Sequence, residues 1–466
     1  MTRPTDPLFD QRIADWLEED PAHAPSQVLD TVLAALPSIP GPRASRAPRR
    51  LLATPSSARW LVAATVVIGV VVFGGALYLL QPREAAVGNP SEMPSPSSSS
   101  VQPTAAFWTA TASLPTPHYG HTATLLPDGK VLVAGGLLRN GATASAWLYD
   151  PSTGTWTATR NMVTPRQFAS ATLLLNGKVL VAGGGSTASG ADSTSAELFD
   201  PSTGTWRATA NMVRPHSQAT ATLLPNGQVL VAGGGTGTPS TATAELYNPD
   251  TGSWTATKNM TKPRQGQTAT LLDQTATLLP DGKVLIAGGY DDTITAANGG
   301  IPENVASAEL FDPATGSWVA TGSMADPRGG QTATLLPDGK VLVTGGEGGG
   351  PGAIGAELYD PDARAWTRAG STPLDSETAT LLPDGTVLVA FGGRAAELYD
   401  SGTGSWTATA SGSTDVGYLA TATLLPDGTV LVVGGEDNGV DYASAELYHP
   451  TTPIAVSPSG DLAPGP

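Results

Sequence analysis

The sequence predicts an all-β domain in which seven similar units of four strands close into a ring. Three observations carry this prediction. A Gly-Gly pair recurs seven times, at spacings of 42 to 57 residues, which is the range of propeller blades. An Asp-Gly or Asn-Gly step stands at a nearly constant distance before each pair. Finally, the last unit is one strand short, and a lone strand-like segment stands at the beginning of the array.

One repeat unit reads TATLLPDGKVLVAGG, then a variable stretch, then a segment such as AELYDP, then xTGTW. The apolar and β-branched runs on both sides of the Asp-Gly step predict a hairpin, which we expect to have a two-residue turn with positive φ at both residues. The Gly-Gly pairs begin at Gly135, Gly183, Gly233, Gly288, Gly345, Gly392 and Gly434. In the tandem copy at 267–283, Gln274–Leu279 is expected to form the strand and Gln267–Asp273 an extra loop.

The fourth strand of each unit is marked by a Trp, and the last unit has none. These Trp residues are Trp156, Trp206, Trp254, Trp318, Trp366 and Trp406. The seventh copy ends at Pro450, whereas Trp108 stands alone before the first copy. We therefore expect Phe107–Ala112 to complete the last unit, which leaves no free sheet edge at the junction of the two ends. The predicted fold is a seven-bladed β-propeller closed by its N-terminal strand.

The repeats resemble kelch repeats. The features that carry the resemblance are the Gly-Gly after strand two, the Tyr-Asp-Pro followed by Trp, and the Met-x-x-Pro-Arg at Met162–Arg166 and Met260–Arg264. The resemblance covers residues 107–450 and implies a binding scaffold. Galactose oxidase uses a similar propeller, but its copper site needs a Cys-crosslinked Tyr. The chain has no Cys, so no cofactor is expected.

Residues 1–106 predict three further segments. Residues 60–80 contain no charge and have about the length needed to span a bilayer. Five Arg residues lie between 43 and 59, whereas Arg83 alone follows closely, so residues 1–59 are expected in the cytosol. Residues 81–106 are rich in Pro and Ser and predict an extended stalk. Residues 451–466 are expected to be a disordered tail.

The cytosolic residues 1–59 show two short helical patterns and can dock a cytosolic partner. This segment resembles the tails that precede the membrane helix in some bacterial anti-sigma-like proteins, which implies a bacterial source. Those proteins carry a His/Cys zinc motif, which this chain lacks.

Composition excludes several classes of function. Without Cys the chain can form no disulfide, no Cys-ligated zinc site and no thiol nucleophile. The net charge of −17 disfavours binding to the phosphate backbone of nucleic acids. No nucleophile elbow, phosphate-binding loop or zinc-helix motif is present, so no catalytic residue is assigned and the chain is not expected to be an enzyme.

Candidate ligand-binding residues are found where the chain leads into strand one. This side of the ring also carries the loops after Gly-Gly, which vary between units as binding loops do. Arg and His side chains there can hold a carboxylate or another polar ligand by charge-assisted hydrogen bonds. Alternatively, each Arg pairs with an Asp of a neighbouring blade or with a loop carbonyl. The candidates are His118, His121, Arg166, His216, Arg264, Arg328, Gln331 and Glu377.

Other polar groups have less support as sites. His118 and His121 can bind a metal, but no carboxylate lies near them in the sequence, so no metal is assigned. Asp291, Asp292 and Glu303, in the loop after Gly288, offer oxygen ligands without the spacing of a calcium loop. The Glu of AELYD recurs in six units, and its repetition argues against catalysis, which needs carboxylates in distinct environments.

The sequence therefore predicts a single-pass protein of the cell membrane. Its propeller would lie outside the cell and bind a protein or a glycan through the variable face. One alternative is a carbohydrate-active enzyme built on the propeller. Another is a signalling protein in which ligand binding outside changes what residues 1–59 bind inside.

Overall fold

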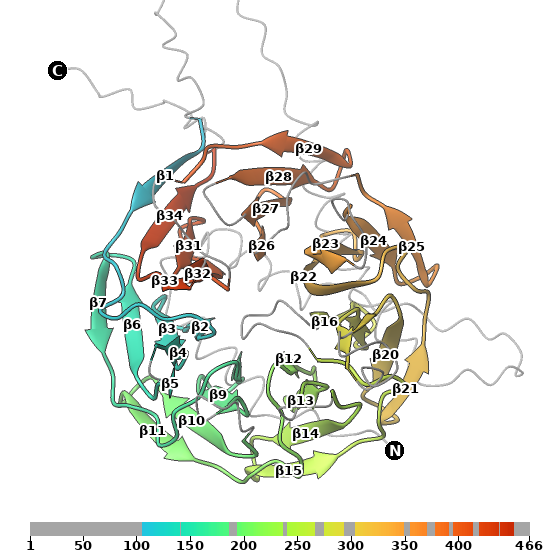
Figure 1. Cartoon of the computed structure of the whole chain (residues 1–466), viewed down its shortest axis with the longest axis horizontal. Helices are drawn as coiled ribbons and strands as arrows, with labels where there is room; N and C mark the ends of the chain where they lie inside the picture. The colour runs from blue at the N-terminus through green and yellow to red at the C-terminus, as the bar shows by residue number, and fades with distance from the viewer. Residues whose placement is uncertain are drawn as a thin grey trace, which may run out of the picture. The chain divides into compact units, whose positions relative to one another are not determined.

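The computed structural model describes residues 105–139, 141–185, 193–235, 240–265, 275–292, 303–348, 355–370, 378–390, 395–412, 419–437 and 439–451. Their backbone forms strands, bridges, turns and bends. Seven four-stranded antiparallel sheets stand around a central axis, as Figure 1 shows. The prediction of an all-β, seven-bladed propeller is confirmed.

Each blade begins with an innermost strand beside the axis and ends with an outermost strand at the periphery. Blade one is β2 (Thr122–Leu125), β3 (Val131–Ala134), β6 (Ala146–Asp150) and β7 (Thr155–Ala158). Blade two is β8 (Ser170–Leu173), β9 (Val179–Ala182), β10 (Ala196–Asp200) and β11 (Thr205–Ala208). Blade three is β12 (Thr220–Leu223), β13 (Val229–Ala232), β14 (Ala244–Asn248) and β15 (Ser253–Ala256). Blade four is β16 (Thr275–Leu278), β17 (Val284–Ala287), β20 (Ala308–Asp312) and β21 (Ser317–Ala320).

The remaining blades follow the same order. Blade five is β22 (Arg328–Leu335), β23 (Val341–Gly348), β24 (Glu357–Asp360) and β25 (Ala365–Arg368). Blade six is β26 (Thr378–Leu381), β27 (Thr386–Ala390), β28 (Ala396–Asp400) and β29 (Ser405–Ala408). Blade seven is β30 (Thr421–Leu424), β31 (Val430–Val433), β34 (Ala445–His449) and β1 (Phe107–Ala110). Small hairpins pair β4 (Leu137–Leu138) with β5 (Gly141–Ala142), β18 (Tyr290–Asp291) with β19 (Glu303–Asn304), and β32 (Glu436–Asp437) with β33 (Val440–Asp441).

The ring is closed by β1, as the orphan Trp predicts. β1 pairs antiparallel with β34, with Trp108 opposite Tyr448 and Phe107 opposite His449. The chain of blade seven is thereby completed by residues from the start of the propeller. Strand closure of this kind removes the sheet edge that would otherwise be exposed at the junction of the two ends.

The hydrophobic core lies between neighbouring blades. Both faces of each sheet are covered by another blade, which is why the second strands, such as β3, are buried along their whole length. One cluster joins Leu132 and Met162 from blade one and its outgoing connection to Val179 and Phe199 of blade two. The innermost strands contact one another in sequence around the ring, from β2 through β30 and back to β2. Packing of adjacent blades therefore holds the ring together.

The hairpin between strands one and two differs from the expected turn. In blade one, Gly129 has a φ of 81°, whereas Asp128 is not among the residues with positive φ. The Gly129 N–H donates to the carbonyl of Leu126 at 2.9 Å. Pro127 holds its own φ near −65°, which fits the second position of a type I turn. The expectation of two residues with positive φ is wrong: the loop has three residues, Pro127–Gly129, and only its last residue, Gly129, is left-handed, as in a type I turn that ends in a left-handed glycine.

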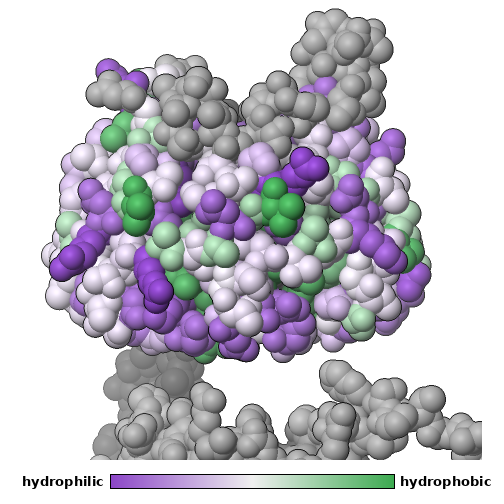
Figure 2. Space-filling model, turned by 90° about the horizontal axis from the view of Figure 1, so that it is seen from below, coloured by the Kyte–Doolittle hydropathy of each residue, from purple (hydrophilic) through white to green (hydrophobic). Residues whose placement is uncertain are grey.

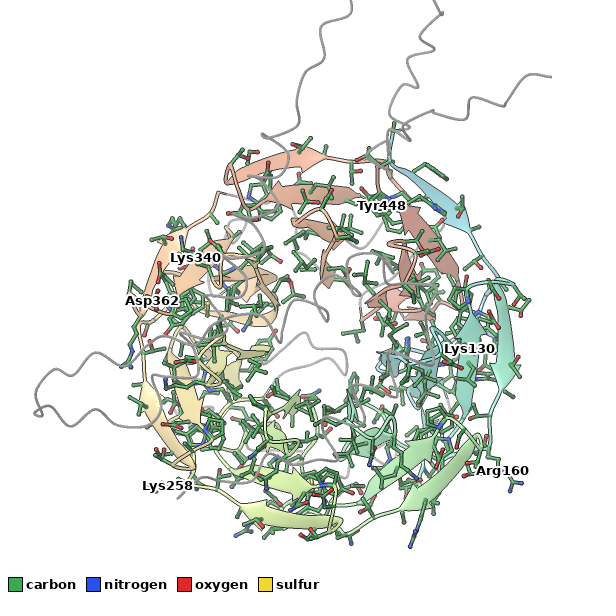
Figure 3. The ribbon with its side chains drawn as sticks, turned by 180° about the vertical axis from the view of Figure 1, so that it is seen from behind. Lys130, Arg160, Lys258, Lys340, Asp362 and Tyr448 are labelled. Atoms are coloured by element: carbon green, nitrogen blue, oxygen red, sulfur yellow. The ribbon has the colours of Figure 1, made fainter. Side chains whose placement is uncertain are left out.

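The outer strands are fastened by their Trp side chains. The indole Nε1 of Trp108 donates to the carbonyl of Ala410 at 2.7 Å, and that of Trp156 to Ala112 at 2.7 Å. Each bond joins an outer strand to the chain that arrives from the preceding blade. The side of the ring in Figure 2 is mostly hydrophilic or neutral, with hydrophobic residues in separate spots. In Figure 3, Arg160 and Lys258 point away from the ring at its periphery.

Several predicted segments lie outside the described residues. They are residues 1–59, residues 60–80, residues 81–104 of the stalk and residues 452–466. In the part of the chain that the structure describes, no helix is long and apolar enough to cross a membrane. Gln267–Asp273 is likewise outside. β16 begins at Thr275, so the second tandem copy supplies the strand, as predicted.

Candidate functional site

The predicted ligand-binding side chains are buried inside the blades. Glu377 lies outside the described residues. The others are 0–1% exposed, namely His118, His121, Arg166, His216, Arg264, Arg328 and Gln331. His118, His121, Arg166, His216 and Arg264 belong to lead-in segments, by which we mean the chain between the outermost strand of one blade and the innermost strand of the next. Arg328 and Gln331 hold the corresponding positions in the first half of β22. A ligand role for these residues stays a prediction, and it requires their present contacts to open.

Arg166 makes the most complete of these contacts. Its Nη2 lies 2.6 Å from Oε1 of Glu197 on β10, and its Nη1 donates to the carbonyls of Gly183 and Ser195 at 2.8 and 3.0 Å. The same carboxylate accepts the backbone N–H of Val163 at 2.7 Å. The pair, which we call a latch, ties the lead-in segment to the blade that it enters. The expected pairing with a loop carbonyl is thus observed, whereas the acidic partner is a Glu of the blade that the segment enters and not an Asp of a neighbouring blade.

Blades four and five repeat the latch. Arg264 Nη2 lies 3.1 Å from Glu309 Oε1, and Arg328 Nη2 lies 2.9 Å from Glu357 Oε1. Burial lowers the pKa of both guanidinium groups below the ordinary value, and the facing carboxylates oppose this effect. Because an arginine stays protonated even so, each latch is a buried ion pair with a structural role.

Blade three uses a histidine in the same place. His216 Nδ1 lies 2.6 Å from the carbonyl of Gly233, and Nε2 lies 3.4 Å from Glu245 Oε1. Burial acts to raise the pKa of Glu245, but hydrogen bonding by His216 and by the backbone N–H groups of Val213 and Arg214 outweighs it and lowers the pKa. In blades two to five the Glu of AELYD therefore serves as the acceptor of a latch, which explains its repetition there without catalysis.

Blade one breaks the pattern, because Trp147 stands where the other blades have Glu. His118 and His121 here face each other, with ring centroids 5.1 Å apart and planes at 83°. Burial lowers the pKa of His118 to about 4. It also lowers the pKa of His121, with a further contribution from His118.

In the five blades where this part of the chain is described, a left-handed residue stands just before the innermost strand or, in blade five, within it, on the variable face. Its φ is 61° at Gly120, 52° at Phe168, 56° at Gln218, 73° at Gly330 and 67° at Leu419. For a non-glycine residue this conformation costs roughly 1–2 kcal/mol of free energy. Non-glycine residues held in such regions concentrate at binding sites and active sites. The partly exposed side chains that blades two, three and seven keep here therefore suggest a binding function.

The backbone of these residues is hydrogen-bonded from blade to blade. The N–H of Phe168 donates to the carbonyl of Gly120 at 2.9 Å, and that of Gln218 donates to the carbonyl of Phe168 at 3.0 Å. Each residue lies beside an innermost strand, and the innermost strands stand nearest the axis of the ring (Figure 1). We call Tyr119, Phe168, Gln218 and Leu419 the inner rim.

Two aromatic rings of the inner rim lie side by side. Tyr119 and Phe168 have ring centroids 6.3 Å apart at 61°. A Cβ on Gly120 would come within 2.7 Å of the Phe168 ring, so this glycine makes room for Phe168. The pKa of Tyr119 is raised by burial and then by the carboxylates of Asp441 and Glu436. The rim thus combines aromatic surface with an amide at Gln218 and nearby negative charge.

The acidic loop after Gly288 holds two blades together. Asp291 and Asp292 are 5% and 6% exposed. Asp292 accepts hydrogen bonds from Ser240 Oγ at 2.6 Å and Gln265 Nε2 at 2.7 Å, which connects blade four to the loop of blade three. Across the described ranges, no three His, Asp or Glu side chains gather as ligands of a metal ion.

The inner rim is not among the residues that the sequence singles out. The candidates predicted from the repeats stand at the position of His118 and at the position three residues later. The position two residues after that of His118 holds Gly in blades one and five and Phe, Gln or Leu in blades two, three and seven. Alternation of Gly with large residues at one position signals a left-handed backbone, and this signal could have found the rim.

Comparisons with known proteins agree with this architecture. Residues 69–279 match the family model described as the KLHDC2/KLHL20/DRC7 Kelch-repeats domain. Over this range the repeats match those of a kelch-repeat family. The matched range ends in blade four, and the same repeat unit continues through blade seven. No curated protein matches the sequence.

A solved structure shares the fold. It is a novel fungal alcohol oxidase with catalytic diversity among the AA5 family, in complex with copper. Its TM-score is 0.58 at 18% identity, over 74% of this chain and 77% of that one. At this identity the likeness concerns the fold alone. The described residues do not fit a copper centre, since His216 and His449 lie in blades three and seven, away from the His118–His121 pair, and no ligand group forms.

Proposed function

We propose that this kelch propeller is a binding module that holds a protein or glycan ligand at its inner rim. The observation that carries the proposal is the left-handed backbone at Phe168, Gln218 and Leu419. Each of these residues occupies a position where glycine would be less strained, and glycine does stand there in blades one and five. Retention of the side chains is explained if they contact a ligand.

The surroundings of the rim support the same function. The aromatic rings of Tyr119 and Phe168 offer flat apolar surface, and Gln218 offers both a donor and an acceptor. A few polar groups set among aromatic side chains are typical of ligand sites. An enzyme finds less support, because the described Glu side chains of blades two to five accept latch hydrogen bonds.

The proposal places the propeller outside the cell, carried by a membrane-spanning segment at residues 60–80 and a stalk. It also retains a docking role for residues 1–59. Protease protection in intact cells tests the first part. Deletion of residues 1–59 tests the second, since an unchanged cellular response to ligand would count against a cytosolic partner.

Binding is tested with the compact unit Ser98–Pro466 on glycan and surface-protein arrays. The informative variants are Phe168→Gly, Gln218→Gly and Leu419→Gly, because glycine relieves backbone strain while it removes the side chain. Arg364→Gly is the matched control: Arg364 has a φ of 52° but lies in the turn between β24 and β25, at the opposite end of the blade. We expect at least a tenfold loss of affinity for a rim variant and none for the control. Equal binding by all four variants would refute the inner rim as the site.

A further inference from the structure

Two histidines lie together where the ring closes. Of the four histidines in the described residues, His118 and His121 lie in the chain that leads from blade seven into blade one. His449 lies within blade seven, at the end of β34 beside β1, and His216 lies in the chain that leads into blade three. Closure of the ring depends on the pairing of β1 with β34, whereas each of the other blades takes its four strands from one continuous stretch of chain. We use the name closing seam for the β1–β34 pair together with the contacts that His118 and His121 make between blade seven and blade one.

His121 is the inner contact of the closing seam. Its Nε2 lies 3.2 Å from Oγ1 of Thr421 on β30, and both residues are 0% exposed. The ring also lies against the backbone of blade seven, since a Cβ on Gly434 would come within 2.8 Å of its Cε1. One imidazole therefore fills the space between the first and last innermost strands.

His118 completes the buried pair. Its Nδ1 lies 2.8 Å from the carbonyl of Thr116, which can only accept, so Nδ1 carries the hydrogen and Nε2 a lone pair. That Nε2 is buried and has no hydrogen-bond partner among the described residues. A proton on Nε2 would create a buried charge without a partner, which is strongly unfavourable.

The acidic groups nearby do not offset such a charge. Asp441 and Glu436, of the small hairpin in blade seven, act on Tyr119. Glu446 lies buried on β34, in the same strand as His449. The pKa of His118 is lowered by burial, and that of His121 by burial and by His118, with no carboxylate among their causes. His216 differs, because Glu245 lies 3.4 Å from it.

Three other seams have a neutral residue in the place of His121: Ala169 at the seam of blades one and two, Ala219 at the next, and Gln331 at the seam of blades four and five. At the seam of blades five and six the equivalent residue is Glu377, which lies outside the described residues. Gln331 fills the space with an amide whose Nε2 donates to the carbonyl of Ala287 at 2.7 Å. A neutral side chain is thus sufficient for a seam, and a histidine adds sensitivity to protons.

We propose that the closing seam is an acid-sensitive joint, which opens when His118 and His121 become protonated and frees β1 from β34 while the other blades stay folded. Tyr119 lies between the two histidines, so the opening would also disturb the inner rim; this last consequence rests on the proposed function. Opening lets the imidazoles reach water and bind protons at their ordinary affinity, and acid therefore favours the open state.

The expected size of the effect follows from His118 alone. With a pKa near 6.5 when exposed and about 4 when buried, the ratio of open to closed seams rises on the order of 60-fold between pH 7 and pH 4.5. His121 adds to this factor. The seams with Ala169, Ala219 and Gln331 in this place have no histidine pair and should change far less over the same range.

Hydrogen exchange of the full chain at pH 7 and pH 4.5, corrected for intrinsic exchange rates, tests the proposal. Peptides covering β1 and β34 should lose protection in acid, while the corresponding pair β11 and β10 of blade two keeps it. His121→Gln copies the side chain that blade five carries and should reduce the acid effect at the seam at least fivefold. His216→Gln is the matched control and should leave the seam as sensitive as in the wild type.

Two results would overturn the proposal. One is an equal loss of protection in blade two and at the closing seam. The other is an unchanged acid response in His121→Gln. Should that variant fail to fold, the pH at which wild-type β1 loses protection decides: a midpoint between 4 and 6.5 supports the histidines, and a midpoint below 4 assigns the loss to carboxylates. Neither measurement involves a ligand, so failure here is distinct from failure of the proposed binding site.

Discussion

The hydroxyl of Tyr247 lies 3.0 Å from the hydroxyl of Thr209, and this contact joins the third strand of blade three to the chain arriving from blade two. Blades one, five and seven repeat it, as with Tyr448 and Thr409 at 3.0 Å; Tyr448 is labelled within its blade in Figure 3. Blade two has Phe199 instead, and there Thr159 donates to the carbonyl of Arg160 at 2.7 Å. The threonine hydroxyl can thus bond either to the tyrosine hydroxyl or to a backbone carbonyl.

Tyr247→Phe should therefore be mild. Thr209 can turn to a backbone carbonyl, as Thr159 does, so no buried polar group loses all its partners. We expect the free energy of unfolding to fall by no more than about 1 kcal/mol, measured by chemical denaturation of Ser98–Pro466. Phe199→Tyr is the reverse exchange and should be neutral or slightly stabilising. A loss of several kcal/mol in Tyr247→Phe would show that Thr209 cannot turn.

The latch of Arg166 and Glu197 should be far more sensitive. Glu197→Ala leaves the buried guanidinium without its carboxylate and the N–H of Val163 without its acceptor. Removal of one partner of a buried ion pair costs about 3–5 kcal/mol, and the denaturation midpoint should fall accordingly. Lys130→Ala breaks the exposed pair with Asp150, 3.0 Å apart, and should produce no measurable change. Comparable effects of the two variants would contradict the structural role of the latch.

Much of this fold could be predicted from the sequence, because repetition shows each feature seven times. Trp108 without its blade was sufficient to place β1 beside β34. The site was harder. Arg166 and Glu197 both stand out as repeated residues, but they belong to different elements, and only the folded blade shows that one covers the other. The left-handed torsion angle at Phe168 goes with a hydrogen bond from its N–H to the carbonyl of Gly120 in the neighbouring blade. A phenylalanine taken by itself does not predict this angle.

Strain in the turn of blade five can be relieved by a single change. Arg364 has a φ of 52°, and the same turn position holds Gly154 at 64° and Gly404 at 69° in blades one and six. Arg364→Gly relieves roughly 1–2 kcal/mol of strain in the folded chain. It also makes the unfolded chain more flexible, which lowers the stability by up to about 1 kcal/mol. We expect a net stabilisation of up to about 1 kcal/mol in thermal unfolding. Arg364→Ala keeps the strain and serves as the control; if it stabilises equally, the strain is not the cause.

The stability of the whole propeller should depend on pH through His118. Its pKa is about 4 in the folded chain against 6.5 ordinarily, so between these values the unfolded state binds more protons. The contribution of the neutral ring is present above pH 6.5 and is lost as the pH falls toward 4. The loss is at most about 1.4 kcal/mol per pH unit, or about 3 kcal/mol in all.

Unfolding measured from pH 7.5 to pH 4 checks this dependence. Between pH 6 and pH 4.5, the slope of the unfolding free energy against pH should be smaller in His118→Gln than in the wild type. The difference should correspond to roughly one proton taken up on unfolding. Carboxylates also titrate toward the acid end, but they are common to both proteins and cancel in the comparison. His449→Gln serves as the control, because this histidine lies at the outer strand pair, where Nε2 is 2.8 Å from Thr109 Oγ1. Parallel curves for the wild type and His118→Gln would mean that the ring reaches water in the folded state and that burial does not set its pKa.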